Sequence, residues 1–249
     1  MHLLDEVQLG HPEWRELLAS ADVAVARGRG KVVLAALSET QRSGVPVVDS
    51  AVAVEGVRDK RLMTQTMIDA GIPTPRTIVG DMADAAESTL AYPLIIKPVF
   101  GDNSVGLAVV EDPDQLSALE WVEPDAIVQE YRPQGGVDLK LYVIDSMLAA
   151  IRKPSPITPC TSEECLGLTE LTPELRDLAR RCREAFGLRF FGIDCLEMPS
   201  GQIQVLEVND FPNYSLVPWA SELLAQQVLQ TVRLSRSHCD TRHRMTLRA

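Results

Sequence analysis

Three polar side chains interrupt a pair of apolar segments near the end of the chain. Glu207 lies within the mostly apolar run 203–208 and Asn209 directly follows that run, and a hairpin turning at Ser200 would place Asp194 opposite Glu207. Two opposed carboxylates repel each other, and desolvating them without a partner is costly. A divalent cation would remove that cost, because carboxylate and amide oxygens are the ligands that magnesium takes. For the hairpin alone, a salt-bridged or solvent-facing group of acids is an equally good interpretation.

Two lysines elsewhere in the chain could bind phosphate oxygens. Lys97 ends the apolar run PLIIK and precedes GDNSVG, residues 101–106, whose glycines allow the backbone to approach a ligand closely. Lys60 begins a predicted helix at 59–70, where the helix N-terminus adds affinity for anions. Each feature alone also fits a surface lysine or an ordinary hairpin turn. Together with the acidic hairpin they supply what a nucleoside triphosphate with magnesium requires, namely cations, a glycine-rich loop and metal-binding anions.

The elements that must position these residues follow from hydrophobic periodicity. Apolar runs at 21–27 and 45–50 predict short buried strands on either side of a helix at 31–43, which together form one α/β unit. Strand hairpins interleaved with helices follow, and this order predicts an α+β arrangement. The expected strand segments are 92–111 with a turn inside it, 125–133, 138–156 and 190–209, and the expected helices are 59–70, about 112–122, 171–188 and 218–232.

The composition is that of an ordinary globular chain. Its 249 residues, 45% of them hydrophobic, can bury a substantial core divided among two or three subdomains. The formal net charge of −11 argues against general nucleic-acid binding, although residues 231–249 hold five Arg and one Asp and are predicted to form a frayed tail. Five irregularly spaced cysteines argue against a disulfide framework. No signal peptide or membrane-spanning run is recognisable, so a cytoplasmic location without membrane contact is expected.

The order of short motifs along the chain resembles the ATP-grasp superfamily, and most closely the ribosomal-protein glutamate ligase type of carboxylate-amine ligases. The motifs are RDK, YPLIIKPVFGDNSVG, IVQEY, GVDLKLYVI, IRK, GID and LEVN, and the match runs from about Asp22 to Val232. The resemblance implies an α+β fold of the ATP-grasp type, in which two α+β subdomains grip ATP. The short segment before Lys60 leaves room for a truncated N-terminal α/β unit only. Part of the acceptor site is therefore expected to be missing or to come from another subunit.

The resemblance also implies roles for individual residues. Contacts to ATP would come from Lys60, Lys97, Ser104, Gly106, Gln129, Glu130, Tyr131, Asp138 and Lys140. Within this set the two lysines at 60 and 97 would hold the α- and β-phosphates, the loop 101–106 would be a lid, and QEY at 129–131 would bind the adenine. The implied catalytic residues are Lys97 and Arg152, the latter near the γ-phosphoryl group. Asp194, Glu207 and Asn209 would hold magnesium, with manganese as the alternative ion.

The resulting prediction is an ATP- and magnesium-dependent carboxylate-amine ligase that forms an amide or peptide bond through an acyl phosphate. Its partners would be small-molecule or peptide carboxylate and amine substrates, and a homodimer is an option. The expected division is a truncated N-terminal unit, a central and a C-terminal ATP-grasp subdomain, and a basic flexible tail, at 1–58, 59–130, 131–232 and 233–249 respectively.

The alternative is a small-molecule kinase of the inositol phosphate kinase type, because KLYVI, RKPSP and NDFPNY are also similar to that family. Residues 155–172 decide between the two at this stage. They contain three acids and no Lys or Arg, which disfavours a polyanionic acceptor and favours the ligase.

Overall fold

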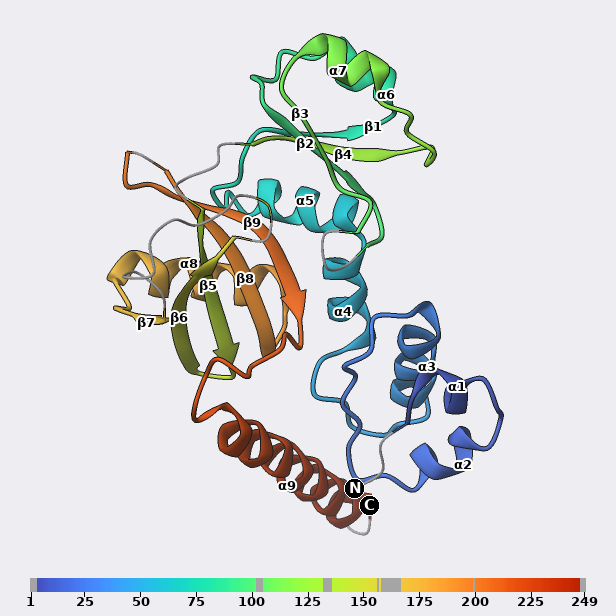
Figure 1. Cartoon of the computed structure of the whole chain (residues 1–249). Helices are drawn as coiled ribbons and strands as arrows, with labels where there is room; N and C mark the ends of the chain where they lie inside the picture. The colour runs from blue at the N-terminus through green and yellow to red at the C-terminus, as the bar shows by residue number, and fades with distance from the viewer. Residues whose placement is uncertain are drawn as a thin grey trace.

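The structure, a computed structural model, describes residues 4–101, 105–131, 136–155, 157, 167–198 and 200–246, with side chains up to residue 236. It contains two antiparallel sheets surrounded by helices (Figure 1). One sheet has the strand order β1-β4-β2-β3 and the other has the order β7-β6-β5-β8-β9. The α+β class predicted from the sequence is confirmed. The exact subdomain boundaries stay predictions.

The four-stranded sheet carries the strand that ends in Lys97. Its strands are β1 (Thr77–Gly80), β2 (Leu94–Pro98), β3 (Ala108–Val110) and β4 (Ala126–Glu130). Apolar side chains such as Leu94, Ile96 and Val128 pack together on the face covered by α6 (Met82–Ala86) and α7 (Pro113–Ala118) (Figure 1). Because side chains alternate along a strand, Lys97 and Gln129 point to the uncovered face.

The five-stranded sheet contains the acidic hairpin. Its strands are β5 (Val137–Ile144), β6 (Met147–Pro154), β7 (Gly167–Thr169), β8 (Phe190–Glu197) and β9 (Ile203–Asp210). One face is covered by α4 (Ala51–Arg58), α5 (Lys60–Asp69) and α8 (Pro173–Phe186), and Leu139 and Leu141 of β5 belong to the core cluster between them. The alternation of β5 therefore sends Lys140 to the opposite face.

Local sequence signals place two of these helices where they were predicted. The carboxylate of Asp59 caps α5 by accepting hydrogen bonds from two backbone N–H groups of the first turn. Thr172 caps α8 in the same way, and Gly187 ends that helix with φ 67°, a conformation that glycine adopts without strain. The predicted boundary at 59 groups α5 with the four-stranded sheet, but Met63 and Met67 bury its apolar side against the five-stranded sheet.

The N-terminal unit contains less sheet than the sequence predicted. Its helices are α1 (Glu6–Leu9), α2 (Trp14–Ala19) and α3 (Lys31–Arg42), and the last of these confirms the predicted helix. The strands predicted at 21–27 and 45–50 reduce to one parallel bridge between Ala24 and Val47. Pro46 accepts a hydrogen bond from Ala24 but has no N–H to donate, which limits the ladder to this bridge.

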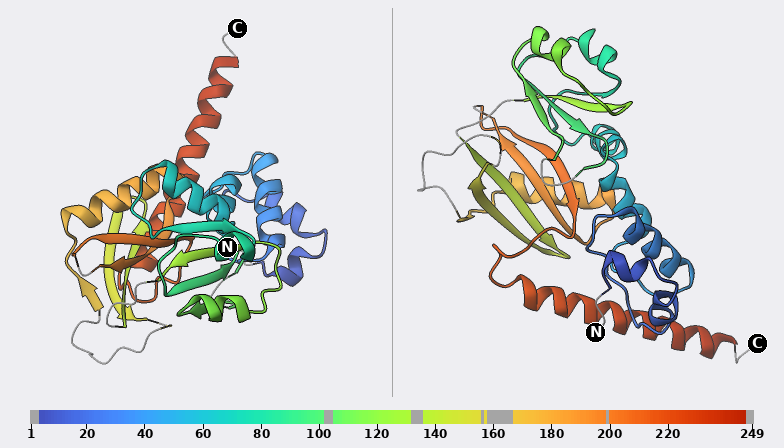
Figure 2. Two further views of the ribbon diagram at one scale, coloured as in Figure 1. Left: turned by 90° about the horizontal axis from the view of Figure 1, so that it is seen from above. Right: turned by 45° about the vertical axis from the view of Figure 1, so that its right-hand side comes forward.

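The last helix, α9 (Ala220–Thr246), is longer than predicted. Its first turns pack on the face of the five-stranded sheet opposite α8, where Ala220 joins a cluster with Tyr142 and Phe190. The region predicted to be a frayed tail continues the helix, and Arg236 pairs with Asp22 of the N-terminal unit at 2.6 Å. Figure 2 shows the end of α9 projecting beyond the rest of the chain. No helix within the described ranges has the length and apolar content that a membrane-spanning helix requires.

Asp49 joins the N-terminal unit to the five-stranded sheet. Its carboxylate, 8% exposed, accepts a hydrogen bond of 2.6 Å from the backbone N–H of Arg189, the residue before β8. Burial raises the pKa of Asp49 to about 6, against the opposing effect of this hydrogen bond and of the Arg189 charge. The folded state therefore favours the neutral acid, and ionisation of Asp49 destabilises it.

Asp49→Asn should remove part of the pH dependence of folding. In the wild type, the stabilisation that accompanies the raised pKa is complete below about pH 4 and is lost as the pH rises through about 6. The asparagine cannot ionise and keeps the acceptor oxygen. We therefore expect the unfolding free energy of the variant minus that of the wild type to increase by up to about 3 kcal/mol between about pH 4 and just above pH 6. Urea denaturation at several pH values measures this difference, and a difference that does not change with pH would contradict the assignment.

Candidate active site

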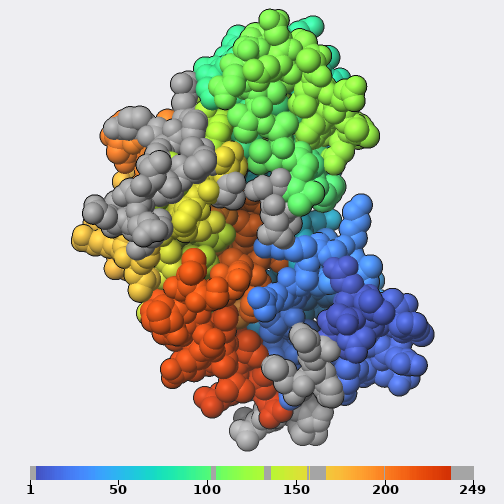
Figure 3. All heavy atoms as spheres, viewed as in Figure 1, coloured from blue at the N-terminus to red at the C-terminus, as the bar shows by residue number. Residues whose placement is uncertain are grey.

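A cleft of about 680 Å³ lies between the two sheets. In Figure 3 the atoms of the four-stranded sheet, in green, lie above those of the five-stranded sheet, in yellow to orange, and the N-terminal unit, in blue, lies beside them. Nine of the residues singled out from the sequence line this cleft: Lys60, Lys97, Gln129, Tyr131, Asp138, Lys140, Asp194, Glu207 and Asn209. The structure therefore brings most of the predicted set together, from both sheets and from α5.

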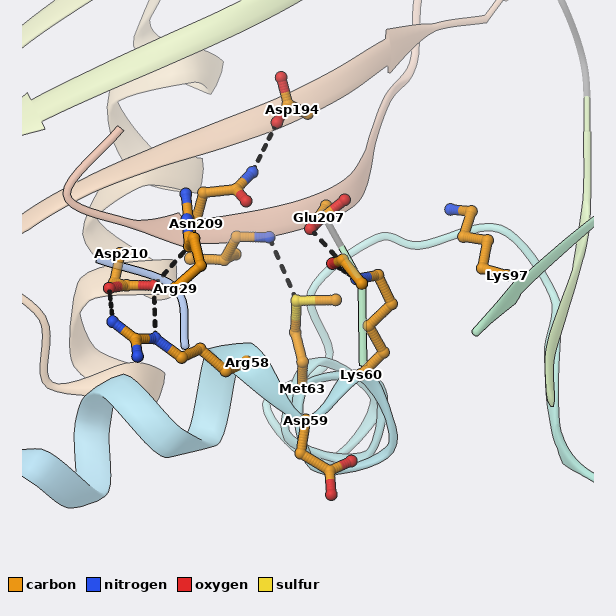
Figure 4. Close-up of polar contacts among 12 residues, drawn as sticks. Arg29, Arg58, Asp59, Lys60, Met63, Lys97, Asp194, Glu207, Asn209 and Asp210 are labelled. Carbon is orange, nitrogen blue, oxygen red and sulfur yellow. Dashed lines mark hydrogen bonds and ion pairs between the residues drawn. The ribbon is translucent and has the colours of Figure 1, made fainter. Parts of the chain in front are cut away.

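The β8-β9 hairpin has the register that the sequence predicted. Asp194 is paired directly with Glu207, and Asn209 is paired with Gly192, with an irregularity just after Asp194. The amide nitrogen of Asn209 donates a hydrogen bond of 2.7 Å to Oδ2 of Asp194 (Figure 4). Two carboxylates and an amide thus converge on one face of the hairpin, where the strand period of two puts them.

Each carboxylate has a lysine as its partner. Lys140 Nζ lies 2.9 Å from Oδ2 of Asp194, and Lys60 Nζ lies 3.7 Å from Oε1 of Glu207. Burial opposes the charge of Lys140, but the charge of Asp194 and the hydrogen bond to it more than offset this and raise its pKa. Lys60 also donates a hydrogen bond of 2.7 Å to the carbonyl of Gly101, so its ammonium links the acidic hairpin to the start of the glycine-rich turn. These two ion pairs compensate the negative charges of the opposed carboxylates.

Lys97 is a half-buried cation whose hydrogen-bond partner is neutral. Its ammonium donates a hydrogen bond of 2.9 Å to the side-chain oxygen of Gln129, whose amide nitrogen in turn donates to Thr77 at 3.0 Å. Burial lowers the pKa of Lys97, and the more distant charge of Glu207 counteracts this only in part. Within the described part of the chain Lys97 forms no ion pair. An anionic ligand in the cleft would therefore stabilise its charge.

Arg152, a residue predicted to be catalytic, does not reach the cleft. In β6 it is paired with Leu139, which belongs to the core under the helices, so Arg152 lies on the face of the sheet opposite the cleft. Its guanidinium pairs with Glu197 at 2.7 Å. The next residue, Lys153, is paired with Asp138 and lines the cleft. The prediction that Arg152 faces the bound nucleotide is therefore wrong. Strand alternation is the signal that could have shown that Lys153, and not Arg152, faces the cleft.

Three further predicted residues are not among the described residues that line the cleft: Glu130, Gly106 and Ser104. The carboxylate of Glu130 accepts hydrogen bonds from Arg76 at 3.2 Å and from the backbone N–H of Ala91 at 2.9 Å, outside the cleft. Gly106, with φ 74°, lies beside Pro98 in the turn that follows β2 and is not part of the lining. Ser104 lies outside the described residues. At Tyr131, which does line the cleft, the backbone N–H donates to the carbonyl of Pro93 at 2.9 Å.

A buried ion cluster next to the acidic hairpin was not anticipated from the sequence. Asp210, 1% exposed, directly follows Asn209 and pairs with Arg58 of α4 and with Arg29, each at 2.8 Å (Figure 4). Arg58 also donates a hydrogen bond of 2.6 Å to the carbonyl of Gly28. The end of β9, helix α4 and the loop before α3 are therefore joined at one point. Asp210 in the run LEVND was visible in the sequence, but its partners are too distant along the chain to be inferred from it.

Asp210→Ala should strongly destabilise the fold. It removes the carboxylate shared by two guanidiniums and deprives the buried guanidinium of Arg58 of its ion-pair partner, which costs about 3–5 kcal/mol of unfolding free energy at neutral pH. Asp177→Ala is the matched control, because Asp177 also pairs with an arginine but is 52% exposed, and we expect almost no change from it. Urea denaturation measures both variants. Equal effects of the two substitutions would show that the Asp210 cluster is not a structural junction.

Comparison with known proteins identifies relatives that are similar in sequence. Residues 57–231 match the family model described as RimK-like ATP-grasp domain. The chain is 31% identical over 192 residues to the probable alpha-L-glutamate ligase 1 of Shewanella amazonensis, which covers 72% of this chain and 64% of that protein. It is 28% identical over 214 residues to the probable alpha-L-glutamate ligase of Marinobacter nauticus, covering 79% and 71%. The match to the Shewanella protein thus spans slightly less than two thirds of that relative's length.

Solved structures with this fold give the same result. A RimK domain ATP-grasp protein from Sphaerobacter thermophilus superposes with a TM-score of 0.68 at 24% identity, covering 83% of this chain and 81% of that one. The D-alanine–D-alanine ligase from Bacillus anthracis complexed with ATP superposes with a TM-score of 0.65 at 20% identity, covering 91% and 84%. These likenesses show the ATP-grasp fold and confirm the resemblance found in the motifs. Because the family match covers more than half of the chain, this protein belongs to the RimK-like ATP-grasp domain family.

Proposed function

We propose that this protein is an ATP- and magnesium-dependent carboxylate-amine ligase, which activates a carboxylate as an acyl phosphate and joins it to an amine. The observation that carries the proposal is the convergence of Asp194, Glu207 and Asn209 with Lys60 and Lys97 in one cleft between two sheets. Phosphoryl transfer requires mainly positioning and charge neutralisation, and these side chains supply both. The names of the relatives, which are glutamate ligases, support the same reaction class.

The donor chemistry of the acidic hairpin fits magnesium. Two carboxylates and an amide offer hard oxygen ligands, and magnesium commonly completes its octahedron with water and substrate phosphates. The described residues contain no cluster of three or more His, Cys, Asp or Glu side chains suited to a metal, so the proposed site depends on Asn209 as its third protein ligand. A bound ion would take over the neutralisation of Asp194 and Glu207 that Lys140 and Lys60 provide in this structure. Magnesium there would supply charge compensation for the phosphoryl oxygens.

The proposed roles of the other residues follow from their places in the cleft. Lys60, Lys97 and Lys140 would bind phosphate oxygens, because their ammonium groups point into the same space as the acidic hairpin. Asp138 and Lys153, paired across β5 and β6, would lie toward the ribose. Gln129 and Tyr131 would border the adenine, with Glu130 contributing through its backbone. The loop 101–106, including Ser104 and Gly106, is proposed as the lid, and Arg152 has no part in this scheme.

The comparisons, and not the cleft, favour a ligase over the kinase alternative. The cations that it contains can promote transfer of a phosphoryl group to any nearby nucleophile, so they do not separate the two reactions. The relatives and the D-alanine–D-alanine ligases among the structural neighbours are all named as ligases, and none of those described above is named as a kinase. A carboxylate acceptor followed by attack of an amine is therefore the better supported chemistry.

The reaction itself can be tested with a pool of amino acids as substrates. The full-length protein with ATP and magnesium should release ADP and inorganic phosphate in equal amounts, together with a product whose mass is the sum of acid and amine less one water. Phosphorus NMR and mass spectrometry follow these species, and removing magnesium with EDTA should stop all of them. Growth of a stable phosphate monoester, with little inorganic phosphate, would establish the kinase instead.

Lys97→Met tests the phosphate-binding role of this lysine, because it keeps the apolar stem and removes the charge. Loss of a charge-assisted contact should weaken ADP binding by about 10- to 150-fold. Lys31→Met is the control, since Lys31 lies outside the cleft, near the ring of Phe100. Titration calorimetry with ADP and magnesium measures both variants. If Lys97→Met binds ADP as tightly as Lys31→Met, then Lys97 is not a phosphate ligand.

A further inference from the structure

Tyr142 is a buried tyrosine whose hydroxyl has no hydrogen-bond partner among the described residues. The residue is 4% exposed and lines the cleft. The described side-chain atoms that are both buried and unpartnered belong to Arg58 and Thr74, so the hydroxyl of Tyr142 is not sealed in the core and reaches the solvent of the cleft. A buried tyrosine normally has a partner for its hydroxyl, and this exception therefore calls for an explanation.

The ring of Tyr142 is held firmly by its neighbours. Its centre lies 5.7 Å from the ring centre of Tyr214, with 52° between the two planes, and it belongs to a core cluster with Ile144 and Phe190. The hydroxyl of Tyr214 donates a hydrogen bond of 2.8 Å to the carbonyl of Val143. The two adjacent tyrosines thus differ in one respect, because the fold uses the hydroxyl of Tyr214 and leaves that of Tyr142 free to bind a ligand. A donor on a fixed ring loses little entropy when it does so.

The register of the five-stranded sheet places Tyr142 level with Asn209. Tyr142 is paired with Gly192, and Gly192 is paired with Asn209. Gly192 has no side chain to fill the space between them, and a Cβ there would lie 3.1 Å from side-chain carbons of Lys140 and Pro212. Tyr142 and Asn209 therefore border the same part of the cleft, where the acidic hairpin ends.

Three side chains of β5 line the cleft in order along the strand, namely Asp138, Lys140 and Tyr142. Neighbours on one face of a strand are about 7 Å apart, which is two residues of strand rise. The ammonium of Lys140 pairs with Asp194 and lies 5.7 Å from the ring centre of Tyr142. Since Asp138 is proposed to lie toward the ribose and Lys140 at the phosphates, the next position in this row belongs to the end of the triphosphate.

The hydroxyl of Tyr142 is a proton donor at neutral pH. A phenol has an ordinary pKa of about 10, and burial raises the pKa of Tyr142, against the opposing effect of the Lys140 charge. The hydroxyl can therefore donate to an anionic oxygen while remaining uncharged itself. Hydrogen bonds to charged groups are stronger than those between neutral groups, so such an oxygen would gain from this contact.

We propose that the hydroxyl of Tyr142 donates a hydrogen bond to an oxygen of the γ-phosphoryl group of ATP. The proposal rests on the nucleotide-dependent function above and adds to it a neutral donor, beyond the lysines and the metal ligands. Because Tyr142 lies past Lys140 in the row along β5, its hydroxyl contacts neither the α- nor the β-phosphate. It therefore contributes to the binding of a nucleoside triphosphate and not to that of a diphosphate.

The test compares ADP with β,γ-methylene ATP, whose methylene bridge prevents phosphoryl transfer. Each is titrated by calorimetry, with magnesium, into the full-length wild type and into Tyr142→Phe. The variant keeps the ring and lacks the hydroxyl. It should bind the ATP analogue at least about tenfold more weakly than wild type and should bind ADP as wild type does. Its urea midpoint should not fall, because no hydrogen bond within the described fold is lost.

Tyr214→Phe is the matched control, because it removes the neighbouring hydroxyl that the fold uses. It should lower the urea midpoint through loss of the hydrogen bond to Val143, and it should leave the preference for the ATP analogue over ADP unchanged, since Tyr214 is not among the described lining residues. The two substitutions thus predict opposite results in the two measurements.

The outcomes separate this inference from the proposed function. If Tyr142→Phe prefers the ATP analogue over ADP as strongly as wild type does, the hydroxyl does not contact the γ-phosphoryl group and the inference is overturned. A fall in the urea midpoint as large as that of Tyr214→Phe would assign the hydroxyl to the fold and also overturn it. If wild type binds ADP but shows no preference for the analogue, only this inference fails. If wild type binds neither nucleotide, the proposed function fails.

Discussion

Repulsion between two opposed carboxylates is the constraint on which the arrangement of the cleft depends. Asp194 and Glu207 are paired across β8 and β9 on the face of the sheet that lines the cleft. Such a pair is stable only if positive charge is brought to it, and the fold brings Lys140 from the neighbouring strand and Lys60 from α5. In such a cleft a metal ion could replace the lysines as the partner of the two carboxylates. The lysines would then be available to bind a polyphosphate. The electrostatic requirement of the fold and that of the proposed reaction therefore coincide.

The same constraint explains why α5 lies where it does. Its N-terminal lysine must reach Glu207, while Met63 and Met67 on its buried side pack into the core of the five-stranded sheet. The ammonium of Lys60 also donates a hydrogen bond to the carbonyl of Gly101, and its backbone N–H donates to the carbonyl of Val99 at 3.1 Å. The helix thus connects the acidic hairpin with the strand end from which the glycine-rich turn begins. Movement of one sheet relative to the other would change the distances from Lys60 to Glu207 and to Gly101.

The N-terminal unit contributes more to the cleft than its length suggests. The expectation that part of the acceptor site is missing or comes from another subunit stays a prediction, and Arg27 and Arg29 reach the cleft from the loop before α3. Asp210 makes this possible, because a buried carboxylate shared by two guanidiniums fixes the loop to the end of β9. A small unit with a single parallel bridge can therefore still form a defined wall, provided that one buried ion cluster positions it.

The sequence by itself determined those features that depend on neighbours along the chain. The hairpin of β8 and β9 is local, so the strand period and the turn near Ser200 were enough to predict that Asp194, Glu207 and Asn209 share a face. The caps of α5 and α8 are local for the same reason. The glycine-rich turn after Lys97 and the helix start at Lys60 also singled out these two lysines, and both line the cleft.

Only the tertiary structure decided what depends on distant partners or on which face of a sheet is covered. Alternation along β6 separates Arg152 from Lys153, but the side that faces the cleft is set by the helices packed on the other side, and the motif alone favoured the wrong residue. Arg29 and Asp210 are 181 residues apart, and no local pattern relates them. Such contacts form because buried charges must find partners wherever the folded chain offers them, and the position of those partners is a property of the assembled core.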